Sequence, residues 1–237
     1  MRAIYLKDLK NKIENNLITI KGEKAHHLQK VARVKIGESI LILDGCGLTV
    51  KAAVESHGKR ELQIKVIESK VIEPKRPSLD LAFCVPKKNA CDEILKIATE
   101  LGINKIYPIH SDFSSRYPFN NERVEKILES ALIQSNNPFF PKFNQVTNFK
   151  DLKGLFESYD RAFVFSSKDN LEASRNKIGS FKNGLVIIGP EGGFSPNEES
   201  FLEEGSKNIK IHLSTPILRA PHALSVAVGF LMGCLVE

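Results

Sequence analysis

The chain has 237 residues, 42% of them hydrophobic and 26% charged, a composition typical of a folded globular protein and not of a disordered one. It starts without an apolar secretion segment, and its longest apolar run, residues 223–236, is too short to span a bilayer. We therefore expect a cytoplasmic protein with no membrane partner. The four cysteines lack a C-x-x-C spacing, so neither a disulfide framework nor a metal site is predicted.

The net charge of +6 is concentrated at the start of the chain. Residues 1–77 carry 16 Lys and Arg against 9 Asp and Glu, a balance of +7, whereas residues 78–237 carry 18 against 19, a balance of −1. This asymmetry favours a module that binds a polyanion, joined to a nearly neutral domain. A solvated, lysine-rich surface explains the charge equally well.

Short strands dominate the first 72 residues. β-branched or alternating runs occupy residues 17–20, 39–43, 48–54 and 62–67, with turn residues at 44–47 and 57–58 between them. One short helix is predicted over residues 24–31. Strands of this length and spacing predict a small β-barrel, and the proline-flanked residues 74–77 are expected to form a linker.

After the linker, predicted strands alternate with predicted helices. The strands are expected at residues 79–85, 104–109, near 145–146, 161–166, 184–188 and 209–213. The helices are expected at residues 89–101, 121–135, 149–159, 195–205 and from 223 to the end. This alternation predicts an α/β domain with a mostly parallel sheet.

A glycine-rich loop follows the apolar strand at residues 184–188. The loop, residues 189–193, has the sequence Gly-Pro-Glu-Gly-Gly, and Ser195, Pro196 and Glu198 then form the expected start of a capped helix. Ligands bind at the carboxyl ends of strands in such sheets, and glycines allow close approach to the backbone. The pattern is neither a P-loop nor G-x-G-x-x-G. A binding loop is favoured, with a plain strand–helix connection as the alternative.

A second candidate loop, residues 213–223, joins the last strand to the last helix and is longer than most such connections. Arg219 is its only cation and is expected to bind a phosphate or carboxylate, unless it forms a surface ion pair. His222 is a weaker candidate for a proton acceptor.

Three weaker features point to RNA. Lys87 and Lys88 follow a predicted strand and can contact phosphate, although a solvated lysine pair is equally plausible. Gln134 stands near a helix end with amide chemistry suited to base edges, and residues 26–33 combine two histidines with Arg33 in the basic segment.

These residues together resemble the RsmE family of SPOUT-class methyltransferases over essentially the whole chain. The similarity is carried by residues 26–37, 100–108 and 134–135, by 188–198, which match the family's IGPEGGFS..E, and by 217–223, which resemble ILRxETA. The chain departs from the family at Pro221-His222 and at Asn136-Asn137. Ala32 replaces a usual leucine.

The resemblance implies an N-terminal PUA-like RNA-binding β-barrel over residues 1–73 and a SPOUT α/β domain over 74–237 with a deep trefoil knot in roughly 184–237. It also implies a homodimer that uses S-adenosylmethionine (SAM) as methyl donor. The implied reaction methylates N3 of a uridine, expected to be uridine 1498, in the 16S ribosomal RNA of the assembled small subunit.

The implied SAM-binding residues are Ile188, Gly189, Pro190, Glu191, Gly192, Gly193, Leu213, Ser214, Ile217, Leu218, Arg219 and Ala223. The expected RNA contacts are Arg2, His27, Arg33, Lys87, Lys88, Arg116 and Gln134. Because the N3 proton must leave, Arg219 is also expected to act in catalysis by holding the anionic base or a phosphate. The alternative is a non-catalytic RNA-binding or ribosome-assembly factor. A nucleotide-phosphate enzyme is disfavoured by the missing P-loop lysine.

Overall fold

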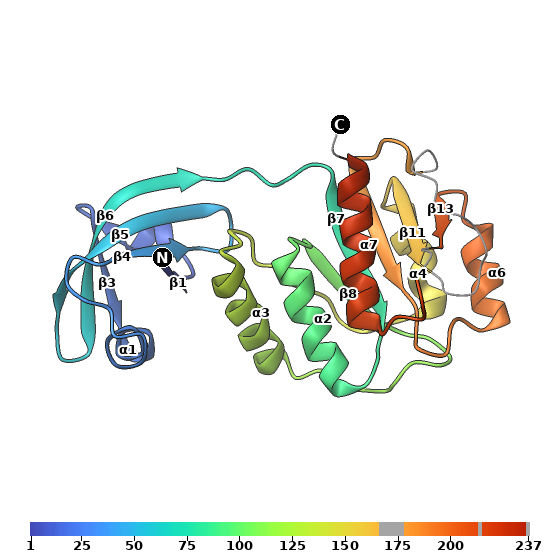
Figure 1. The fold of residues 1–237 in the computed structure, drawn as a ribbon, viewed down its shortest axis with the longest axis horizontal. Helices are drawn as coiled ribbons and strands as arrows, with labels where there is room; N and C mark the ends of the chain where they lie inside the picture. Colours follow the sequence, from blue (N-terminus) through green and yellow to red (C-terminus); the bar gives the residue numbers. More distant parts are fainter. Residues whose placement is uncertain (166–177, 213–214, 236–237) are drawn as a thin grey trace. The chain divides into compact units, whose positions relative to one another are not determined.

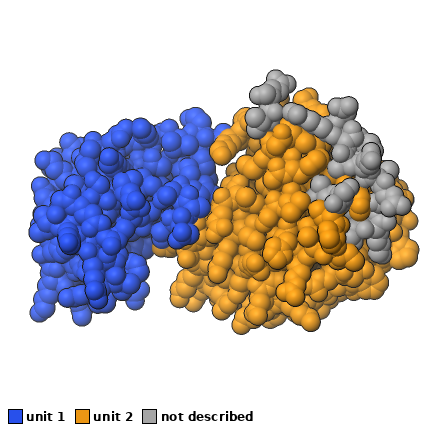
Figure 2. Space-filling model, in the orientation of Figure 1, with its two compact units in different colours: residues 1–74, 132–140 blue, residues 75–131, 141–237 orange. Residues whose placement is uncertain are grey.

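The computed structural model describes residues 1–165, 178–212 and 215–235. It divides into two compact units, one of residues 1–74 and 132–140, the other of residues 75–131 and 141–237 (Figure 2). The first boundary follows Pro74. The second falls inside helix α3 (Asn121–Ser135), whose last turn groups with the first unit.

The first unit contains a six-stranded sheet in the order β1-β4-β5-β6-β3-β2. The β1–β4 pair is parallel and the other pairs are antiparallel. The four strands predicted in this region are confirmed, and the short strands β1 and β2 were not predicted. The strands are β1 (Arg2–Tyr5), β2 (Ile13–Glu14), β3 (Leu17–Lys21), β4 (Ser39–Leu43), β5 (Leu48–His57) and β6 (Glu61–Val71).

One apolar core lies inside this sheet. Alternate residues of β3 and β4, such as Ile18 and Ile40, are fully buried, as the period of two along a strand requires. Helix α1 (Gly22–His26) and the adjoining π-helix η2 (His27–Val31) add Ala25 and Leu28 to the same core. Register shifts in the β5–β6 pairing bend these strands, which allows the sheet to curl around the core.

Residues 132–140 join this unit through backbone contacts. Gly47 donates its N–H to Pro138 O at 3.0 Å, and Phe140 donates to Gly45 O at 2.8 Å. Gly47 has a φ of +104°, and a β-carbon there would stand 2.7 Å from Ile72 O, so the position requires glycine.

The second unit is built on a parallel sheet in the order β10-β8-β7-β12-β11-β13, with β9 also pairing with β8. This confirms the predicted α/β class. Its described strands are β7 (Ser78–Cys84), β8 (Lys105–His110), β9 (Lys142–Phe143), β10 (Thr147–Asn148), β11 (Arg161–Phe165), β12 (Asn183–Ile188) and β13 (Asn208–Ile211).

The strand predicted near residues 145–146 is found directly after them, as the two-residue β10, and residues 145–146 themselves separate β9 from β10. The side-chain amide of Asn144 donates to the carbonyls of Ile106 and Lys142 at 3.2 and 3.3 Å. A side chain that binds backbone carbonyls in this way competes with the strand ladder and interrupts it.

Helices cover both faces of the sheet, as a parallel sheet needs (Figure 1). Helices α2 (Lys88–Glu100) and α7 (Ala220–Leu235) contact each other, and α7 also contacts β12. The opposite face packs against η3 (Phe149–Asp151), α4 (Leu152–Glu157) and α6 (Pro196–Glu204), which supply a cluster of buried aromatic and leucine side chains. No helix in the described ranges has both the length and the apolar character to cross a membrane.

Candidate cofactor site

The glycine-rich loop leaves the sheet at the end of a buried central strand. Residues 184–188 of β12 are all buried between β7 and β11, and the loop begins at the carboxyl edge directly after Ile188. A β-carbon at Gly189 would lie 2.9 Å from the ring of Phe194, and Gly193 adopts a φ of +77° while donating to Pro190 O at 2.9 Å. The loop conformation therefore depends on glycine at both positions.

The capping box predicted at the start of α6 is confirmed. Ser195 is the N-cap, Pro196 is the first helical residue, and Glu198 accepts the Ser195 N–H through Oε2 at 2.9 Å. The second oxygen of Glu198 accepts the N–H of Asp112 at 2.9 Å, and the Ser195 hydroxyl donates to Asp112 Oδ2 at 2.6 Å. These bonds fasten the loop after β8 to the end of the glycine loop.

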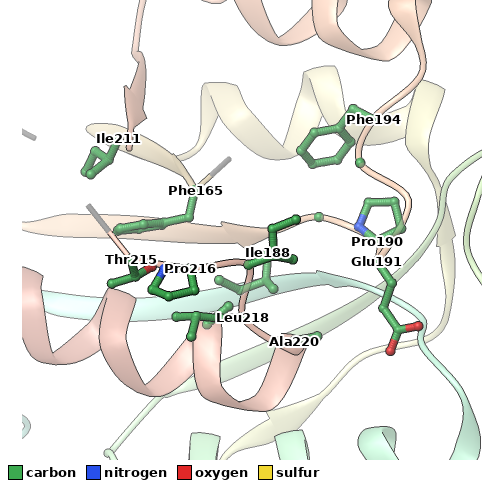
Figure 3. Close-up of a pocket in the computed structure, with 14 residues that line it drawn as sticks. Phe165, Ile188, Pro190, Glu191, Phe194, Ile211, Thr215, Pro216, Leu218 and Ala220 are labelled. Carbon is green, nitrogen blue, oxygen red and sulfur yellow. The ribbon is translucent and has the colours of Figure 1, made fainter. Parts of the chain in front are cut away.

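A cavity lies against the inner side of the glycine loop (Figure 3). Its wall combines loop residues with apolar side chains from β11, β12, β13 and α7. Figure 3 shows the Glu191 side chain extending away from the apolar group that includes Phe165, Ile188 and Leu218. The predicted residues that line the cavity are Ile188, Gly189, Pro190, Glu191, Gly193, Ile217, Leu218 and Ala223.

Six lining residues were not named individually as cofactor contacts: Thr215, Pro216 and Ala220, which lie in the second candidate loop, Phe194, which directly follows the glycine loop, and Phe165 and Ile211, which lie outside both loops. Phe165 and Ile211 end the strands β11 and β13, which lie next to one another in the sheet. The rule that ligands bind at the carboxyl ends of strands would have found them, had the strand order been known.

Two predicted cofactor residues do not line the cavity, and two others, Leu213 and Ser214, lie outside the described residues. Gly192 is exposed and lies against Phe113, while Arg219 is exposed and directly precedes α7. The segment before this helix is shorter than expected, because α7 begins at Ala220 and not after Ala223.

The candidate RNA-binding residues are all exposed. In the first unit, Arg2 pairs with Glu38 at 2.5 Å, and His27, Arg33 and Gln134 also lie on the surface.

In the second unit, Lys87 and Lys88 occupy the N-terminal end of the 13-residue helix α2, where the helix dipole disfavours positive charge. Burial, and then the charge of Arg116, lower the pKa of His110 below its ordinary value.

Comparison with known proteins places the chain in a family. A family model described as an RNA methyltransferase domain matches residues 73–232, and one described as an RNA methyltransferase PUA domain matches residues 20–67. The curated relative "Ribosomal RNA small subunit methyltransferase E 2" of Borreliella burgdorferi is 29% identical over 244 residues, which cover 100% of this chain and 99% of the relative. The chain belongs to the RsmE family of RNA methyltransferases.

Other RsmE proteins align over a similar extent. "Ribosomal RNA small subunit methyltransferase E" of Bacillus subtilis is 26% identical over 94% of this chain and 93% of its own length. The crystal structure of the RsmE protein of Neisseria gonorrhoeae, bound to S-adenosyl methionine, superposes with a TM-score of 0.80 at 21% identity, covering 98% of this chain and 97% of the other. The family resemblance and the PUA-like and α/β fold predicted from sequence are thereby confirmed.

Proposed function

We propose that the chain transfers a methyl group from SAM to N3 of a uridine in the RNA of the small ribosomal subunit, with uridine 1498 as the expected target. The observation that carries this proposal is the cavity bounded by the glycine loop, at the carboxyl edge of β12, within the segment that matches the RNA methyltransferase family. The names of the relatives, which are methyltransferases of small-subunit ribosomal RNA, support the substrate class.

The cavity fits the chemistry of SAM. Its apolar wall, with Ile188 and Leu218, suits the flat face of adenine, and the backbone of residues 189–193 offers hydrogen-bonding groups to the polar edges of the cofactor. Glycine at position 189 lets the Phe194 ring, which also lines the cavity, pack directly against the loop backbone. Bound SAM supplies an electrophilic methyl group on its sulfonium.

The residues of this chain must align the uridine with that methyl group and manage the proton on N3. Arg219 stands between Leu218 and Ala220, both of which line the cavity, and its own side chain is exposed to an incoming RNA. We assign to Arg219 the role of stabilising the anionic base or a phosphate beside it.

Basic residues in both units support RNA as the substrate. The excess of +7 in residues 1–77 falls mainly in the segment that matches the RNA methyltransferase PUA domain. Lys87 and Lys88 place positive charge at the N-terminus of α2, where the positive end of the helix dipole makes it unfavourable. A bound anion such as an RNA phosphate would offset this repulsion. Action on ribosomal RNA agrees with the expected cytoplasmic location.

The proposal includes a homodimer and the trefoil knot expected in residues 184–237. Helix α7 contains no Asp, Glu, Lys or Arg, and its Val226 is exposed. Gly229 and Gly233 follow Val226 in the same helix, and the space that a β-carbon at either glycine would face is open. Such a face permits close approach of a second copy. Val226→Asp should yield a monomer in sedimentation, whereas Ser130→Asp on α3 should not, and an unchanged dimer in Val226→Asp would contradict this interface.

The deciding experiment incubates unmethylated small ribosomal subunits with the protein and SAM and measures N3-methyluridine by mass spectrometry. The proposal expects this nucleoside to appear. Arg219→Ala should slow transfer roughly 100-fold or more, while Arg161→Ala, at the opposite edge of the sheet, should not. No SAM binding in calorimetry would favour the non-catalytic RNA-binding factor, and transfer by Arg219→Ala at the wild-type rate would exclude the role of Arg219.

A further inference from the structure

Phe113 is exposed to solvent, unlike the other phenylalanines of this chain. The sequence contains 14 phenylalanines, all within the described residues, and the other 13 are buried or partly buried. Phe113 leaves 58% of its surface in solvent. A single large exposed ring is an informative departure from the usual burial of aromatic side chains and needs a reason.

The backbone that carries this ring is firmly held. Residues 111–114 form a turn in which Ser114 donates both its N–H, at 3.3 Å, and its hydroxyl, at 3.0 Å, to Ser111 O. Asp112, directly before the ring, bonds to Ser195 and Glu198 at the start of α6. Phe113 is therefore presented to solvent from a fixed loop, and its exposure does not come from a loose chain.

The ring lies on the outer side of the glycine loop. A β-carbon at Gly192 would stand 3.5 Å from the Phe113 β-carbon and 3.8 Å from its Cγ, which is ordinary van der Waals contact. Neither Gly192 nor Phe113 lines the cavity. The ring thus lies beside the loop that bounds the cavity, without lining the cavity itself.

We propose that Phe113 stacks against an unpaired base of the substrate RNA at the rim of the cofactor site, an inference that rests on the proposed function. Proteins that recognise single-stranded RNA place unstacked bases on exposed aromatic rings, and enzymes that modify a base first take it out of its stack. Asp112, the residue directly before Phe113, brings a carboxylate to the same turn and disfavours a bound phosphate there, so a base is the more suitable partner than the RNA backbone.

The test compares three variants in steady-state methylation of unmethylated small ribosomal subunits. Phe113→Leu keeps an apolar side chain against Gly192 but removes the aromatic face, so KM for the subunits should rise roughly 5- to 150-fold. Phe113→Ala should behave similarly. Phe113→Tyr keeps the face and should restore KM to within about twofold of wild type. SAM affinity in calorimetry should be the same in all variants, because the ring lies outside the cavity.

A wild-type KM for the subunits in Phe113→Leu would overturn the inference, whether the affinity of this variant for SAM is unchanged or weaker. A weaker affinity would assign the ring to the cofactor site. A wild-type protein that transfers no methyl group would contradict the proposed function separately. In that case, equilibrium binding of the same subunits tests the stacking separately. Phe113→Leu should bind the subunits more weakly than Phe113→Tyr, and equal binding would contradict stacking.

Discussion

Glu198 joins both sides of the candidate cofactor loop, and replacing it should loosen the loop and destabilise the fold together. Its side chain is 5% exposed, and its two oxygens accept the backbone N–H groups of Ser195 and Asp112, each at 2.9 Å. Glu198→Ala leaves both donors without their acceptor. Ser195 is buried, so its unpaired N–H costs about 1–3 kcal/mol, while the N–H of the exposed Asp112 regains water and loses about 0.5–1.5 kcal/mol.

The free energy of unfolding of Glu198→Ala should therefore fall by about 1.5–4.5 kcal/mol. Urea unfolding followed by circular dichroism measures this loss. Glu198→Gln keeps one acceptor and should lose roughly half as much. Calorimetry should show weaker SAM binding in Glu198→Ala, because a loosened loop populates its binding-competent conformation less often.

The matched control is Glu204→Ala, an exposed glutamate in the last turn of the same helix. Its free energy of unfolding should stay within about 0.5 kcal/mol of wild type. Unfolding of Glu198→Ala at the same urea concentration as this control would contradict a stabilising role of the Glu198 carboxylate.

Three further predictions concern other parts of the chain. Gly47→Ala should lower the free energy of unfolding by about 1–3 kcal/mol in chemical denaturation, because its φ is +104° and the new β-carbon would meet Ile72 O at 2.7 Å. Burial raises the pKa of the Cys84 thiol to about 12, so at about pH 8 alkylation of the native protein, mapped by mass spectrometry, should modify exposed Cys46 and spare Cys84. Backbone N–H groups lower the pKa of Asp160 below its ordinary value of 3.8. The charged carboxylate therefore stabilises the fold above pH 3.8, and this stabilisation is lost as the pH falls through the pKa of the folded state. In Asp160→Asn, the midpoint of urea unfolding should fall less steeply with decreasing pH over this acid range.

Each of these has a clear contrary result. Gly102→Ala has a φ of +78° but open space around the new β-carbon, so a Gly47→Ala loss no larger than that of Gly102→Ala would contradict the clash. Rapid native-state alkylation of Cys84 would contradict its burial. An acid limb as steep in Asp160→Asn as in the wild type would contradict the assigned cause.

Local patterns in the sequence predicted the elements that position the site. The apolar run of β12 marked a buried strand, and Ser195, Pro196 and Glu198 marked the start of α6 together with its capping box. These signals are readable because burial and capping depend on residues close together in the chain.

Contacts between distant segments could not be predicted in the same way. Asp112 and Ser195 are 83 residues apart, and nothing local to either residue indicates the bond between them. Phe165 and Ile211 join the cavity because β11 lies beside β12 and β13, and strand order is a property of the whole sheet. The short strands β1 and β2 were missed because so few residues carry no readable period.

The grouping of residues 132–140 with the first unit has a consequence for how this protein can have changed by recombination. A genetic exchange limited to the first 74 residues would replace the turn that holds Gly45 and Gly47 but not the segment that bonds to it. The incoming module would have to match a backbone surface encoded 91 codons downstream of Gly47, which is the separation of Gly47 and Pro138, the two residues that the bond joins. An exchange that keeps this unit intact therefore has to carry both segments, although they are separate in the gene.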